Sequence, residues 1–118
     1  MAQVRIEDKT VAIHFSRAEK FGALRGDLHF PRSAVRAARV VDKPFAEIQG
    51  FRSPGTRVPG IMALGTWRRP GGDRDFVAVY CGERGIVVEV DPKASSYRRV
   101  ILSSKDPDGV RNLLAAAT

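Results

Sequence analysis

Hydrophobic and polar residues alternate with a period of two over about the first hundred positions of the chain. This period is typical of β-strands that bury one face. Segments 4–6 and 11–15 show it first, and the polar residues 7–9 lie between them. The pattern therefore predicts a β-hairpin at the N-terminus.

The alternation returns further along the chain, between clusters of glycine, proline and polar residues. We expect strands at 28–30, 34–41, 61–67, 76–80, 86–90 and 97–103. Residues 16–23 and 45–48 interrupt the pattern and predict single helical turns. The glycine-bounded connection 82–85 predicts a hairpin between the strands on its two sides.

The last dozen residues change to a helical period. Asp106 precedes Pro107, which is the order expected for a helix N-cap followed by the first helical residue. Apolar residues then recur at the spacing of one helix face: Val110, Leu113, Leu114 and Ala117. A helix this short is unstable alone in water, so we expect a helix at about 106–117 that docks on the sheet.

Residues 50–60 form the most unusual segment, Gly-Phe-Arg-Ser-Pro-Gly-Thr-Arg-Val-Pro-Gly. Its two Pro-Gly pairs, at 54–55 and 59–60, predict two tight turns and hence a loop of defined shape. This segment could have a structural role or bind a ligand. In the structural interpretation, the loop shapes a strand crossover, Phe51 plugs the core and the arginines only keep the loop soluble. Turn chemistry alone explains the spacing, so we prefer this interpretation.

The expected fold class is mainly β. About seven to eight short antiparallel strands would form a small barrel or sandwich capped by one C-terminal α-helix. One domain over residues 1–118 fits this length, since domains cluster near roughly 100–150 residues.

The chain also carries a distinctive set of motifs. They are Leu24-Arg-Gly-Asp-Leu28, Pro31, Ser33-Ala-Val35, the segment 50–60, Ala63-Leu-Gly-Thr66, Asp75-Phe-Val-Ala-Val79 and Ser103-Ser-Lys-Asp-Pro107. As a set they resemble a family of short bacterial proteins described as pleckstrin-homology-like, and the resemblance covers nearly the whole chain. It implies a single pleckstrin-homology-like barrel and no established activity.

Composition narrows the function classes. With 43% hydrophobic and 28% charged residues, the chain resembles an ordinary globular domain, and its charged N-terminus lacks the apolar core of a signal peptide. We therefore expect a cytoplasmic protein. The single Cys81 cannot form an internal disulfide, and two histidines, His14 and His29, are too few for a zinc site. We predict no metal, no cofactor and no catalytic residue, because a lone cysteine after an apolar strand is usually inert.

The net charge of +7 makes an anionic partner plausible, and arginine supplies 15 of the 20 basic residues. The basic residues are spread along the chain, however, which is also typical of an ordinary solvated surface. We expect no specific nucleic-acid binding, only weak and salt-sensitive association.

The preferred hypothesis is a non-catalytic binding or scaffolding module for a protein or peptide. It would use an exposed strand edge or the groove beside the C-terminal helix. The alternative is a site for a small anionic ligand or an acidic membrane surface within residues 50–69. Its predicted residues are Arg52, Arg57, Trp67, Arg68 and Arg69, with the indole of Trp67 as a stacking face.

Overall fold

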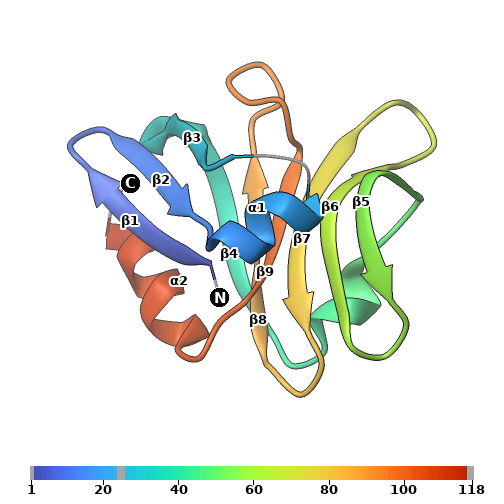
Figure 1. Cartoon of the computed structure of the whole chain (residues 1–118). Helices are drawn as coiled ribbons and strands as arrows, with labels where there is room; N and C mark the ends of the chain where they lie inside the picture. The colour runs from blue at the N-terminus through green and yellow to red at the C-terminus, as the bar shows by residue number, and fades with distance from the viewer. Residues whose placement is uncertain (1, 24–25, 117–118) are drawn as a thin grey trace.

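The computed structural model describes residues 2–23 and 26–116. This part of the chain forms two β-sheets, two α-helices and two short 3-10 helices (Figure 1). The elements, in order, are β1 (Gln3–Glu7), β2 (Thr10–His14), α1 (Arg17–Ala23), β3 (Leu28–Pro31), η1 (Arg32–Ala34), β4 (Val35–Val41), η2 (Pro44–Glu47), β5 (Phe51–Val58), β6 (Met62–Arg68), β7 (Arg74–Tyr80), β8 (Gly85–Val90), β9 (Arg99–Ser103) and α2 (Pro107–Ala116). The predicted mainly-β class with a C-terminal helix is confirmed.

The strands form a three-stranded sheet in the order β1-β2-β3 and a six-stranded sheet in the order β4-β8-β9-β7-β6-β5. The N-terminal hairpin is antiparallel, as predicted, with Glu7 opposite Thr10. The larger sheet is mixed, because β9 pairs in parallel with β7 and antiparallel with β8. Strand β9 lies between β7 and β8, and all five of its residues are buried. The predicted hairpin between residues 76–80 and 86–90 is therefore wrong.

Two clusters of buried apolar side chains cover the two faces of the large sheet. The larger cluster packs one face of the large sheet against β2, β3 and Leu114 of α2. The smaller cluster includes Trp67, Val77 and Ile101 on the opposite face. Phe45 and Ile48 pack on the smaller cluster, because the connection from β4 to β5 contains η2 and packs against β7, β8 and β9.

The two predicted turns in residues 50–60 have different outcomes. Pro59-Gly60 makes a turn, with the Ile61 amide donating to the Val58 carbonyl at 2.9 Å and Gly60 at a φ of +73°. Pro54-Gly55 does not, because both residues lie inside β5, at a register shift opposite β6. Proline is tolerated there because β5 is an edge strand. A Cβ at Gly55 would lie 2.3 Å from the Leu64 carbonyl oxygen, so the close strand pairing requires glycine.

Helix α2 begins as predicted. The Gly109 amide donates to Asp106 Oδ1 at 3.1 Å, which is an N-cap hydrogen bond. Leu114 is 1% exposed, whereas Leu113 is 40% exposed, so the predicted apolar stripe is only partly buried. Leu24 and Arg25 of the resemblance motif and Ala117 of the stripe lie outside the described residues.

None of the described helices is long and apolar enough to cross a membrane.

Candidate functional site

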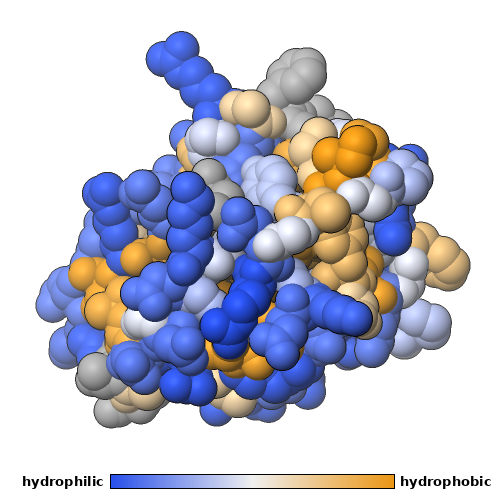
Figure 2. Space-filling view, turned by 90° about the horizontal axis from the view of Figure 1, so that it is seen from below, coloured by the Kyte–Doolittle hydropathy of each residue, from blue (hydrophilic) through white to orange (hydrophobic). Residues whose placement is uncertain are grey.

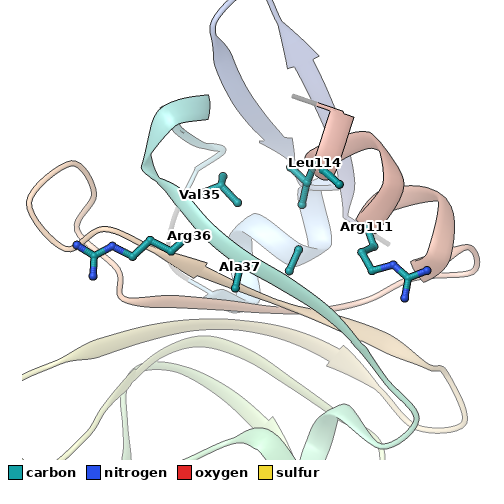
Figure 3. A pocket seen from close by; sticks show the side chains of 7 residues that line it. Val35, Arg36, Ala37, Arg111 and Leu114 are labelled. Carbon is teal, nitrogen blue, oxygen red and sulfur yellow. The ribbon is translucent and has the colours of Figure 1, made fainter. Parts of the chain in front are cut away.

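A groove lies between β4 and α2 (Figure 3). Its volume is about 190 Å³, and seven residues line it: Val35, Arg36, Ala37, Ala38, Arg111, Leu114 and Ala115. Five of these side chains are aliphatic. In Figure 3 the guanidinium groups of Arg36 and Arg111 extend to opposite sides, so the groove has an apolar floor between two basic ends.

Strand β4 is one edge of the six-stranded sheet. Within the described residues it pairs with β8 alone, from Val35 opposite Val90 to Val41 opposite Gly85. The register shifts between Val35 and Ala37, which is a β-bulge at Arg36. An edge strand presents backbone amide and carbonyl groups that another extended chain can pair with. The groove therefore adjoins a row of backbone hydrogen-bonding groups.

The two basic ends of the groove have weak internal partners. Arg36 Nη2 lies 3.4 Å from Asp91 Oδ2, and Arg111 Nη2 lies 3.4 Å from Asp108 Oδ1. All four side chains are substantially exposed, and exposed ion pairs of this kind contribute only about 0–1 kcal/mol. Either arginine can therefore exchange its partner for a carboxylate of a bound molecule at little cost.

The arginines predicted in residues 50–69 are divided between the faces of the large sheet. Arg52 lies opposite Trp67 and Arg57 opposite Ala63, which puts both arginines on the Trp67 face. Arg68 lies opposite Phe51 on the other face, and both side chains are exposed. The expectation that Phe51 plugs the core is wrong, since this side chain is 70% exposed.

Trp67 and Arg69 are engaged inside the protein. The indole of Trp67 is 2% exposed beneath the β4–β5 connection, so its ring offers no stacking face to a ligand. Arg69 Nε lies 3.1 Å from Asp75 Oδ2, and its Nη2 lies 3.7 Å from Asp73. Arg52, Arg57 and Arg68 are the members of the predicted set that remain exposed.

A second charged cluster surrounds His14 at the end of β2. Its Nε2 lies 3.1 Å from Glu7 Oε1 and its Nδ1 lies 3.0 Å from Asp27 Oδ2. The hydrogen bonds to Glu7 and then to Asp27 raise the pKa of His14 above 6.5. The backbone amide of Phe15 donates to Asp27, and this bond is the main reason that the pKa of Asp27 falls to about 2. Sequence reasoning placed no carboxylates near His14, because Glu7 and Asp27 reach it from separate segments.

Glu19 is a buried carboxylate that sequence reasoning also missed. It accepts hydrogen bonds from the Ser16 amide at 2.9 Å and from the Tyr80 hydroxyl at 2.6 Å. The Glu19 amide donates to Ser16 Oγ, which completes a capping box at the start of α1. Burial of the phenol, with the Glu19 hydrogen bond, raises the pKa of Tyr80. The Ser16-x-x-Glu19 spacing was the available signal.

The described residues contain no group of three or more histidine, cysteine and acidic side chains placed to hold a metal ion. Cys81 is exposed at the end of β7.

No protein-family model, curated protein or solved structure matches the chain.

Proposed function

We propose that this protein is a non-catalytic binding module that takes up an extended peptide along β4, beside α2. The observation that carries the proposal is the position of β4. It is an edge strand, and an apolar groove with two basic ends lies next to it. In strand addition, main-chain hydrogen bonds supply affinity and a neighbouring pocket supplies specificity.

The groove also favours one kind of peptide. A strand added to β4 would lie about 4.8 Å from it, which brings alternate side chains of the peptide toward the aliphatic floor. The floor accepts a small or medium apolar side chain, because Val35, Ala38 and Leu114 line it. Arg36 and Arg111 would then contact acidic residues on either side of this apolar residue.

The second edge of the large sheet is a poorer template. Pro54 lies inside β5 and has no amide proton, and the register shift between Arg52 and Gly55 interrupts the strand. The same devices protect edge strands from unwanted pairing in other proteins. Of the two edges of the large sheet, β4 is thus the better supported site for strand addition.

The resemblance to pleckstrin-homology-like proteins agrees with this structure in part. The mainly-β chain and its C-terminal helix agree with the motif resemblance, while the parallel pairing of β7 with β9 departs from the expected antiparallel barrel. The proposal therefore depends on the β4 edge and not on the family.

A peptide-display selection tests the proposal. We expect selected peptides to be extended, with an apolar residue between acidic ones. Arg36→Gln with Arg111→Gln should weaken their binding about tenfold or more, since hydrogen bonds to charged groups contribute roughly 1.5–3 kcal/mol. The matched control, Arg5→Gln with Arg17→Gln, removes the same charge from exposed positions on β1 and α1 and should leave affinity unchanged. Equal weakening by both pairs, or selection of no peptide, would contradict the proposal.

A further inference from the structure

Six arginines from four segments of the chain meet at one end of the large sheet, drawn uppermost in Figure 1. Strands β5, β7 and β9 begin at this end and β6 ends there. The six are Arg52, Arg68, Arg69, Arg74, Arg98 and Arg99. We call this set the arginine end.

Two of these arginines are neutralised internally. Asp75 is fully buried and forms ion pairs with both Arg69 and Arg99. Among the described residues, no carboxylate lies within 4 Å of the guanidinium groups of the other four, as the ion pairs of this end all involve Asp73 or Asp75. The arginine end therefore carries a surplus of positive charge.

The strand register brings like charges together. Arg68 lies directly opposite Arg74, and such a cross-strand pair of like charges destabilises a sheet. The guanidinium of Arg74 is held 5.8 Å above the Tyr97 ring, and the Arg98 amide donates to the Arg74 carbonyl at 2.7 Å. A bound polyanion would relieve this repulsion.

An exposed aromatic ring lies in the same row. Phe51 is opposite Arg68 on the same face of the sheet, where cross-strand Cβ atoms lie about 4.5–5.5 Å apart. The Phe51 side chain is 70% exposed. A flat ring beside a flat guanidinium is the combination on which unpaired bases stack, while neighbouring arginines contact the phosphates.

We propose that the arginine end binds single-stranded nucleic acid without sequence preference, with Phe51 stacking on a base and with Arg68, Arg74 and Arg98 contacting the backbone phosphates. This surface is separate from the groove beside α2, and the proposal stands independently of peptide binding.

The apolar residues of the surface favour this partner over a lipid bilayer. Insertion into a membrane interface needs a broad apolar face. The other two large apolar side chains exposed in the described chain lie elsewhere, Ile61 after the β5–β6 turn and Leu113 on α2. Figure 2, which shows the opposite end of the molecule, places a hydrophobic patch on the side where β5 and β6 lie. A single exposed ring such as that of Phe51 is suited to stacking on a base rather than to insertion into a membrane.

Fluorescence anisotropy with labelled oligothymidylate tests the proposal. We expect Phe51→Ala to weaken binding about tenfold and Phe51→Tyr to retain it, because stacking needs the ring. Arg68→Gln with Arg74→Gln should lower the slope of log affinity against log salt by about 1.4, at about 0.7 for each phosphate contact on a single strand. Arg5→Gln with Arg17→Gln removes the same net charge and should leave the slope unchanged. All these side chains are at least partly exposed, and thermal melts would verify that the variants fold.

Three results would overturn the proposal. The first is no binding of oligothymidylate at low salt. The second is an equal loss for the arginine pair and its control, which would show that only total charge matters. The third is binding to vesicles of anionic phosphatidylglycerol that depends on Phe51 while oligothymidylate binding does not, which would assign the surface to membranes.

Discussion

Arg99 donates two hydrogen bonds to one oxygen of Asp75, from Nε at 3.0 Å and from Nη2 at 2.7 Å. The two residues lie side by side at the start of the parallel pair β7–β9, and Asp75 is fully buried. Arg99 Nη2 also donates to the Glu47 carbonyl at 3.0 Å, which links η2 to the sheet. This interaction fastens the β4–β5 connection over Trp67.

Asp75→Ala should lower the free energy of unfolding by about 3–5 kcal/mol. The substitution removes the carboxylate and leaves two arginines without their buried counter-charge. Asp73→Ala is the matched control, because Asp73 is about half exposed and its ion pair with Arg69 is long. This variant should change stability by about 0.5 kcal/mol or less. Urea unfolding measures both, and a small effect at Asp75 would contradict the role of the buried pair.

The two leucines of α2 should behave differently. Leu114→Ala removes a fully buried side chain from the main cluster and should cost about 2–5 kcal/mol. Leu113 is 40% exposed, so Leu113→Ala should cost less than about 1 kcal/mol. Sequence periodicity predicted equal burial for both. The denaturant midpoints of the two variants measure the loss of stability in each. Equal losses would mean that α2 docks through a wider face than the structure shows.

Protonated His14 should stabilise the N-terminal hairpin. The pKa of His14 is raised in the folded state by the hydrogen bonds to Glu7 and Asp27. Because the folded pKa exceeds the unfolded value of about 6.5, the stabilisation is fully present below pH 6.5 and is lost as the pH rises through the folded pKa. An NMR titration of the His14 ring should give a pKa above 6.5.

Glu7→Gln removes the largest cause of this shift, so the pKa of His14 should fall. Glu83→Gln, in the connection between β7 and β8, removes a charge elsewhere and serves as the control. An unchanged His14 titration in Glu7→Gln would show that the Glu7 contact does not persist in solution.

Local patterns predicted most elements but not how they are arranged. Period-two alternation located the strands other than β5, which was expected to be a loop, and Asp106-Pro107 located the start of α2, because both signals arise within a few residues. The insertion of β9 between β7 and β8 has no local signal, since it depends on pairing between distant segments. The same non-local pairing assembles the arginine end.

The turn predicted at Pro54-Gly55 failed for a related reason, whereas the turn predicted at Pro59-Gly60 is present. Pro54-Gly55 has the composition of a turn, but its neighbours pair with β6, and the edge position of β5 accommodates the proline. The sequence predicts a stacking role for Trp67, because this residue precedes two arginines. Trp67 is buried in the smaller cluster, and Phe45 and Ile48 of the β4–β5 connection pack against that cluster from a separate segment of the chain. The groove beside α2 was expected, although its basic ends were not.

Amide hydrogen exchange tests the strand-addition proposal most directly. A peptide selected for binding would be added, and exchange would be followed along the whole chain. Strand addition predicts new protection in β4, at residues 35–41, and little change in β5, because the peptide pairs with the free side of β4. Protection confined to other segments, or binding without any protection of β4, would contradict the proposal.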